Sequence, residues 1–111
     1  MTVDITSILQ FSRRHESIGE HLFQNWLYDK IVDLVGDHVL DIDACGNMWV
    51  ELADPKTHPF LFVAHTDTVH SQDGVVRLMH YTVSGQSMIG LANKEMGCLG
   101  ADDGCGVYAN L

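Results

Sequence analysis

Apolar residues recur at helical spacing over one long stretch near the N-terminus. Ser17 and Glu20 stand at its start with the spacing of a capping box, in which each residue satisfies a free backbone donor of the first turn. Gly36 follows the last apolar position and predicts the end of the helix, because glycine tolerates left-handed backbone. A shorter helix is expected over Asp4–His15. The stripe predicted to face the core comprises Ile18, Leu22, Phe23, Trp26, Leu27, Ile31, Leu34 and Val35.

The pattern then changes to short strands. Gly46-Asn47 is a turn signal between the first two strands and predicts a hairpin. Phe60–Ala64 is apolar throughout, which is typical of a strand buried on both faces. A last helix is expected to begin at Asp102 or Asp103, either of which can cap it. The strands that we predict are His38–Asp43, Met48–Leu52, Phe60–Ala64, Val75–Val83 and Ser87–Leu91.

This order of elements predicts an α/β fold in which a mixed sheet is flanked by helices and chemistry lies on the loops at strand ends. The 111 residues suit a single domain spanning 1–111, and 46% hydrophobic with 19% charged residues is an ordinary globular balance. Because 15 acidic residues face 6 basic ones, giving a net charge of −9, nucleic acid and anionic membranes are poor partners. No apolar run is long enough for a membrane span, and Met1–Leu9 lacks the pattern of a secretory signal, so we expect a cytoplasmic protein.

The three cysteines, Cys45, Cys98 and Cys105, argue against a disulfide framework. Their number is odd, and none of them forms the CxxC spacing of an all-cysteine zinc site. We expect reduced thiols that are buried or half-buried.

Candidate chemistry begins where the run Phe60–Ala64 leads into His65 and Asp67. Residues two apart in extended backbone face the same side. The Asp67 carboxylate can therefore accept a hydrogen bond from one nitrogen of His65 while the other nitrogen binds a metal ion. Such a contact fixes the tautomer of a histidine ligand and raises its basicity. A His-x-Asp pattern alone is common by chance, so it needs a second element.

That second element is the segment Leu99–Val107, in which Asp102 and Asp103 stand side by side among three glycines. Helix capping accounts for one carboxylate, and the second adds repulsion. A carboxylate that bridges two divalent cations would remove this repulsion. The glycines would allow close approach of the backbone or unusual dihedral angles.

In this order and at this spacing, His65–Val69 and Gly100–Gly106 resemble the co-catalytic, two-zinc metallopeptidase and deacylase superfamily. Its members include peptidase T, glutamate carboxypeptidases and acetylornithine deacetylase. The amphipathic helix and the Gly-Asn turn within Asp43–Asn47 are similar to the opening of that family, so the resemblance covers about Ser17 to Leu111. It implies the N-terminal part of a zinc-exopeptidase-like catalytic domain.

The resemblance implies a role for each matching residue. His65 and Asp102 would be metal ligands, with Asp102 bridging two zinc ions, although cobalt or manganese would suit the same ligands. Asp67 would be the catalytic residue that orients His65, and Asp103 would not be a ligand. The peptide bond between Asp102 and Asp103 is expected to be strained and cis. Zinc-bound water would attack the peptide or N-acyl amide bond of a peptide or N-acyl amino acid substrate.

Two positions depart from the family pattern: Gly104, where the family commonly has Lys or Arg, and His70, where it often has Pro. We expect His70 to be an exposed loop residue, with a substrate contact or accessory ligand as the alternative. The family's general-base Glu and its later ligands have no counterpart after Asp103. The domain is therefore expected to be incomplete and inactive alone, with a second chain or a homo-oligomer completing it.

Two other hypotheses remain open. The chain could be a catalytically inactive, truncated remnant that acts as a binding or assembly module, with at most weak metal affinity through His65 and Asp102. It could also be a helix–sheet domain with no metal role, in which His65 and the Asp pair are structural. A second polypeptide that carries a Glu-Glu pair and a late His would favour the enzyme.

Overall fold

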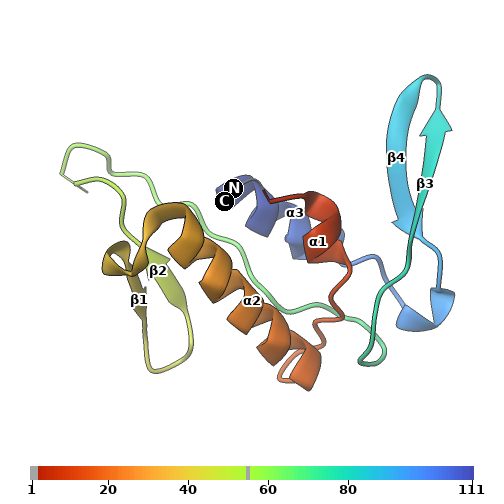
Figure 1. Cartoon of the computed structure of the whole chain (residues 1–111), viewed down its shortest axis with the longest axis horizontal. Coiled ribbons are helices and arrows are strands. Elements are labelled where there is room, and N and C mark those ends of the chain that lie inside the picture. The colour runs from red at the N-terminus through yellow and green to blue at the C-terminus, as the bar shows by residue number, and fades with distance from the viewer. Residues whose placement is uncertain (1–2, 55) are drawn as a thin grey trace.

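The computed structural model describes residues 3–54 and 56–111, so Met1, Thr2 and Pro55 lie outside the description. Three α-helices occupy the middle of the molecule, and two β-hairpins lie at its opposite ends (Figure 1). The described elements are α1 (Ile5–Leu9), α2 (Ile18–Val35), the 3₁₀ turn η1 (Asp37–Val39), β1 (Leu40–Ile42), β2 (Met48–Val50), β3 (Leu78–Val83), β4 (Gln86–Leu91), the 3₁₀ turn η2 (Lys94–Met96) and α3 (Ala101–Asn110).

Helix α2 begins and ends where its sequence signals predict. The Ser17 side chain accepts a hydrogen bond from the Glu20 backbone N–H at 3.2 Å, and Gly36 follows the last turn at φ +87°. The return contact differs from a standard capping box, because Glu20 Oε1 accepts from the Glu16 N–H at 3.0 Å. The start of α2 is thus held by two interlocked side-chain bonds.

The core lies between α2, α1 and α3. Its buried members are Ile8, Phe23, Leu27, Ile31 and Val107. The α2 stripe is only partly used, because Ile18 and Leu22 remain 71% and 55% exposed. An aromatic group extends the core, with the Phe11 ring 5.2 Å from that of Phe23 and the Trp26 ring stacked on Phe23 at 5.7 Å.

The mixed α/β character is confirmed, but the single mixed sheet is not present among the described residues. Instead there are two separate two-stranded antiparallel sheets, β1–β2 and β3–β4. Each strand pairs only with the other strand of its own hairpin, because tight turns bring sequence neighbours together at little entropic cost. The helices separate the two hairpins, which keeps them from joining (Figure 1).

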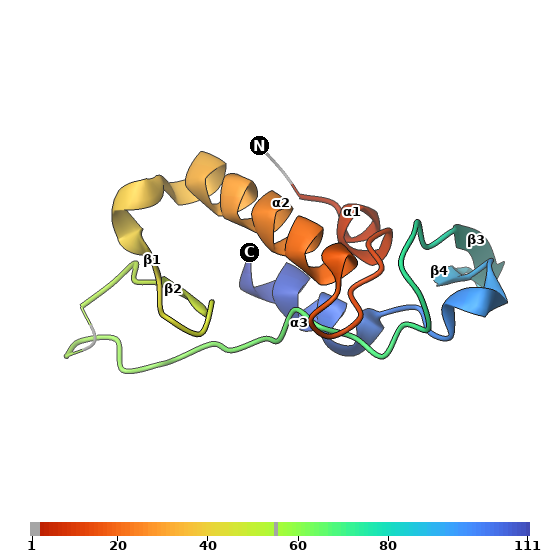
Figure 2. The same ribbon diagram turned by 90° about the horizontal axis from the view of Figure 1, so that it is seen from below.

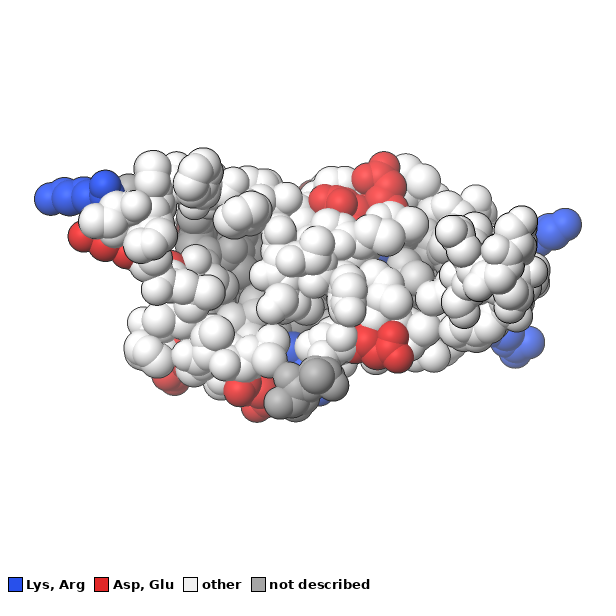
Figure 3. Space-filling model, turned by 90° about the horizontal axis from the view of Figure 1, so that it is seen from above, with Lys and Arg blue, Asp and Glu red and all other residues white. Residues whose placement is uncertain are grey.

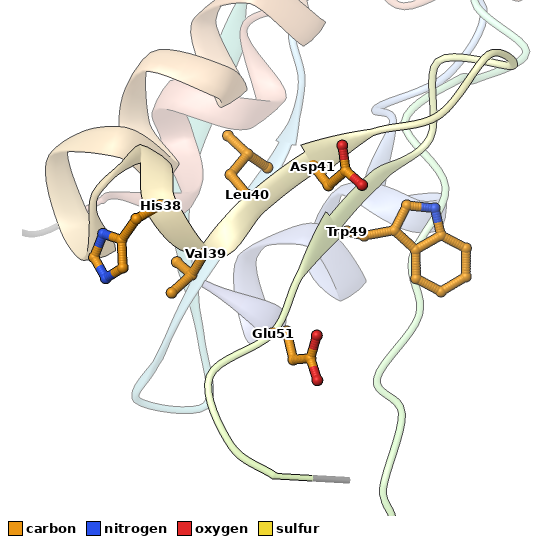
Figure 4. Close-up of a pocket in the computed structure, with 6 residues that line it drawn as sticks. All are labelled: His38, Val39, Leu40, Asp41, Trp49 and Glu51. Carbon is orange, nitrogen blue, oxygen red and sulfur yellow. The ribbon is translucent and has the colours of Figure 1, made fainter.

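The β1–β2 hairpin is held at its turn by Asp43. Its carboxylate accepts from Asn47 Nδ2 at 2.9 Å and from Trp49 Nε1 at 3.1 Å. The side-chain bond from Asn47, supported by that from Trp49, lowers the pKa of Asp43 to about 2. Beside this hairpin lies an open pocket of about 280 Å³ (Figure 4). Its lining residues are His38, Val39, Leu40, Asp41, Trp49 and Glu51.

The prediction of a buried strand at Phe60–Ala64 is wrong. The segment is not assigned to a strand, and Phe60, Leu61, Phe62 and Val63 are 71–81% exposed. In Figure 2 it forms part of a long trace that runs beneath the helices towards α3. A strand buried on both faces needs pairing strands and covering layers. The described residues place neither around this segment.

Other expectations are corrected in smaller ways. The first helix is shorter than Asp4–His15, because α1 ends at Leu9 and the following residues form isolated bridges to Val75 and Thr68. The thiols are more exposed than expected: Cys45 and Cys105 are exposed, and Cys98 is intermediate.

None of the described helices combines the length and apolarity needed to cross a membrane. On the face in Figure 3, acidic groups are scattered, and most Lys and Arg atoms project at the two ends.

Candidate metal centre

The two predicted metal ligands lie together, although 37 residues separate them in the sequence. His65 Nε2 is 3.1 Å from Asp102 Oδ1. His65 comes from the extended trace after Phe60–Val63, and Asp102 comes from the first turn of α3. The Asp102 side chain is 95% exposed and that of His65 is 53% exposed, so both can reach a ligand from solvent.

The third predicted residue, Asp67, lies on the other side of the imidazole. His65 Nδ1 donates to the Asp67 backbone carbonyl at 3.0 Å, and Asp67 Oδ1 is 3.2 Å from the same nitrogen. Because Nδ1 carries a proton, the nitrogen that is available to bind a metal ion is Nε2, which faces Asp102. The sequence prediction that Asp67 contacts His65 is therefore met, with the backbone carbonyl as an additional acceptor.

These contacts set the protonation behaviour of His65. Partial burial acts to lower its pKa, but the hydrogen bonds and charges of Asp67 and Asp102 outweigh burial and raise the pKa. The imidazolium form can donate to Asp67 and Asp102 at once. A metal ion bound to both His65 and Asp102 would take the place of the Nε2 proton.

The start of α3 presents Asp102 because the helix is irregular there. Asp102 and Asp103 have non-helical dihedral angles, and the peptide bond between them is cis, as the resemblance leads us to expect. Asp103 has a different partner, because its Oδ1 accepts from the Gly106 N–H at 3.1 Å. This is capping of the regular part of the helix, so Asp103 is the capping residue, while the Asp102 carboxylate contacts His65.

A pocket of about 320 Å³ opens over these residues. It lies where the segment after His65 meets the loop before α3. Its lining residues are His65, Asp67, Thr68, Val69, Cys98, Leu99, Gly100, Ala101 and Asp102. The His65–Asp102 pair therefore lies in the wall of a pocket that is open to solvent.

Arg13 joins the two halves of this site, and the sequence analysis missed it. Its guanidinium Nη2 donates to the Gly100 carbonyl at 2.6 Å, just before α3. Its backbone carbonyl accepts from the Thr68 N–H at 2.7 Å, and its backbone N–H donates to His70 Nδ1 at 3.2 Å. One residue thus ties the His65 segment and the Asp102 segment to the N-terminal region.

The Arg13 side chain is fully buried, which is unusual for a cation. Burial lowers its pKa, while the nearby Cys98 thiol and the Asp103 and Asp67 carboxylates act to raise it. The guanidinium also lies 4.9 Å from the centre of the Phe23 ring, within cation–π range. Its Nε and Nη1 have no hydrogen-bond partner among the described residues.

The expectation that His70 is an exposed loop residue is wrong, because its side chain is only 2% exposed. Its Nδ1 receives the Arg13 N–H and contacts the Thr68 hydroxyl. Burial, with a further contribution from the positive charge of Arg13, lowers the pKa of His70. His70 is therefore held as a neutral acceptor within the structure.

Close packing around Arg13 also accounts for two glycines of the α3 motif. A Cβ at Gly104 would lie 2.9 Å from Arg13 Nη2, and a Cβ at Gly100 would lie 2.7 Å from the same atom. Gly100 also has φ +84°, which disfavours any side chain. Beside Gly104, where the sequence resemblance implied that Lys or Arg is common, lies the guanidinium of Arg13.

A second group of possible ligands includes Asp67 itself, through the carboxylate oxygen that contacts His15. One ligand atom each from His15, Glu20 and Asp67 fall within 4.8 Å of one another. His15 Nδ1 is 3.1 Å from Asp67 Oδ2. The sequence offered no sign of this group, because its residues show no recognised motif and Glu20 is explained by helix capping.

Comparison of the chain with protein-family models, with curated proteins and with solved structures finds no match. The functional argument therefore depends on the geometry of the site and on the motifs in the sequence.

Proposed function

We propose that this chain contributes a metal centre to a metal-dependent peptidase or amide hydrolase, with His65 and Asp102 as ligands. The observation that carries the proposal is the 3.1 Å separation of His65 Nε2 and Asp102 Oδ1. Imidazole and carboxylate ligands bind zinc at about 2.0–2.2 Å. Two such atoms on one tetrahedral ion lie about 3.3 Å apart by trigonometry, so the pair fits with little movement.

Each residue has a distinct task in this proposal. His65 binds through Nε2, while Asp67 accepts the Nδ1 proton and keeps the imidazole in the tautomer that can bind. Asp102 offers a carboxylate that can join two ions. When bound, the metal would supply Lewis-acid chemistry, by activating water and polarising a substrate carbonyl. The pocket beside Val69 and Leu99 would receive the acyl or side-chain portion of a peptide or N-acyl amino acid.

Two side-chain ligands do not complete a catalytic centre, which uses at least three protein ligands for a single zinc ion. Within residues 3–54 and 56–111, the His65–Asp102 pair has no third side chain from the His/Cys/Asp/Glu set close enough to form a recognised group. The remaining ligands and the general base would come from another polypeptide segment. This chain alone is then expected to bind metal weakly and to show no hydrolysis.

The deciding experiment measures zinc binding by calorimetry and by equilibrium dialysis against a fixed zinc concentration. Replacement of Asp102 by Ala should reduce zinc affinity at least tenfold, because it removes one of two ligands. Asp103→Ala is the matched control, since this neighbouring carboxylate caps α3 by accepting from Gly106 and is not a proposed ligand. Unchanged zinc binding in Asp102→Ala would refute the assignment.

A second candidate function has its own supporting observation. The exposed apolar residues Phe60–Val63 suit a protein that assembles with another chain, so an inactive binding or assembly module remains the alternative. Light scattering coupled to gel filtration, with zinc binding measured on the same sample, separates the two. A stable assembly that binds no zinc would favour the module over the hydrolase.

A further inference from the structure

We propose that His15, Glu20 and Asp67 form a second cation site, separate from the His65–Asp102 pair and selective for a divalent transition-metal ion. Three segments supply the ligands: the turn before α2, the first turn of α2, and the stretch after His65. One ligand atom from each falls within 4.8 Å of the other two. In an octahedral site, ligand atoms lie about 2.1–2.4 Å from the ion. Neighbouring ligand atoms are then about 3.0 Å apart, and opposite ones are up to about 4.8 Å apart.

The backbone fixes the cluster before any ion binds. Arg14 and Thr68 form a parallel bridge, and the Thr68 N–H donates to the Arg13 carbonyl at 2.7 Å. These contacts bring His15, the residue after Arg14, close to Asp67, the residue before Thr68. His15 Nδ1 consequently lies 3.1 Å from Asp67 Oδ2.

Glu20 is fixed by its own partners. Its Oε1 accepts from the Glu16 N–H at 3.0 Å, and its Oε2 accepts from Thr66 Oγ1 at 3.3 Å. Gln24 Nε2 donates in turn to Thr66 Oγ1 at 3.3 Å. Each carboxylate oxygen has a second lone pair, so these bonds orient Glu20 without using up its capacity as a ligand.

The charges at this place favour a cation. Glu16 adds a third carboxylate, with its Oε1 3.6 Å from His15 Nε2. The buried guanidinium of Arg13 interacts with the charge of Asp67, and the positive end of the α2 dipole stabilises the Glu20 carboxylate in its first turn. An ion with direct bonds to both carboxylates would lie between Glu20 and Asp67.

The ligand set also selects the kind of ion. One imidazole with two carboxylates suits Zn²⁺, Mn²⁺, Fe²⁺ or Co²⁺, whereas Ca²⁺ and Mg²⁺ prefer oxygen ligands alone. Asp67 would serve both places, since its Oδ1 faces His65 and its Oδ2 faces His15. An ion at His15 would therefore alter how Asp67 holds His65, which couples the two sites. The competing interpretation is that His15 only pairs with the carboxylates and the cluster binds no ion.

The test uses Mn²⁺ as the probe with the ¹⁵N-labelled full chain. Mn²⁺ broadens the amide signals of residues close to it, and calorimetry gives the number of ions bound. His15→Ala and Glu20→Gln should each remove the broadening around residues 15–20 while leaving that around 101–103. Glu16→Gln and Ser17→Ala are the matched controls, because they alter the same turn and its cap without removing a proposed ligand.

The outcomes separate this site from the proposed metal centre. Loss of one of two ions in His15→Ala, with the other lost in Asp102→Ala, supports both sites. Loss in His15→Ala and none in Asp102→Ala supports the second site and refutes the His65–Asp102 assignment. Unchanged binding in both His15→Ala and Glu20→Gln overturns the inference, as does loss of one and the same ion in His15→Ala and in Asp102→Ala.

Discussion

Two neighbouring parts of one extended trace behave in opposite ways. Residues Phe60–Val63 are apolar and 71–81% exposed, whereas Thr68 and His70, a few residues later, are polar and 7% and 2% exposed. The polar pair is bonded to the backbone of Arg13. Hydrophobicity therefore does not decide which part of this trace is anchored. The anchored part is instead decided by hydrogen bonds to the buried residue Arg13. These bonds satisfy polar groups that would otherwise be buried without the hydrogen bonds that water provides.

Among the polar residues that anchor this trace, Arg13 should give the largest effect when it is replaced by Ala. The replacement removes the donor to the Gly100 carbonyl and the packing against Phe23, so the free energy of unfolding should fall by about 3 kcal/mol, in the range for buried hydrogen bonds to charged groups plus lost packing. Urea denaturation measures this change. Arg14→Ala is the control, because Arg14 is half-exposed and its ion pair with Asp73 at 3.6 Å should contribute less than about 1 kcal/mol. Equal losses in the two variants would show that Arg13 is not the anchor.

An intermediate effect should come from pH. The pKa of His70 is lowered by burial in the folded chain, so the unfolded chain binds more protons as pH falls below about 6.5. Its contribution to stability is present above that pH and is lost as pH falls towards the lowered pKa. His65, whose pKa is raised, acts in the opposite direction. The loss of stability between pH 7.5 and 5.5 should therefore be smaller in His70→Gln than in the wild type, and an identical pH profile would contradict the assignment.

The smallest effect on folding is expected at Phe62. Its side chain is 79% exposed, so Phe62→Ser should change the free energy of unfolding by no more than about 0.5 kcal/mol. The same change should reduce self-association at high concentration, since it interrupts the exposed apolar run. Phe23→Ala is the buried counterpart and should cost about 3–5 kcal/mol. A large loss of stability in Phe62→Ser would mean that the segment packs against the rest of the chain in solution.

The same contrast shows what the sequence could predict. Helix α2 and the β1–β2 hairpin follow from local signals, namely the Ser17 cap, Gly36 and the Gly46-Asn47 turn, because their contacts lie close in sequence. The strands of the second hairpin were predicted as Val75–Val83 and Ser87–Leu91, and β3 begins later than predicted, at Leu78. The burial of Phe60–Ala64 was predicted wrongly, because a central strand depends on partners that its own residues do not specify. The burial of Arg13 and His70 had no local signal at all, since each is fixed by residues 57 or more positions away.

The candidate site was predicted in part for the same reason. The motifs identified His65, Asp67 and Asp102, and the structure brings these three together. The motifs did not identify His15 or Glu20, whose proximity to Asp67 arises only after the N-terminal segment pairs with Thr68. Residues that meet through tertiary contacts leave no spacing pattern for a sequence to show.

The bonds of Arg13 also have a kinetic consequence. They close loops of 57 residues to His70 and 87 residues to Gly100, whereas α2 and the hairpins close within a few residues. Long loops cost more conformational entropy before any contact repays it, so contacts of this kind tend to form late in folding. The His65–Asp102 pair would then assemble after the helices and hairpins. A metal ion added during refolding would report the completion of this last step.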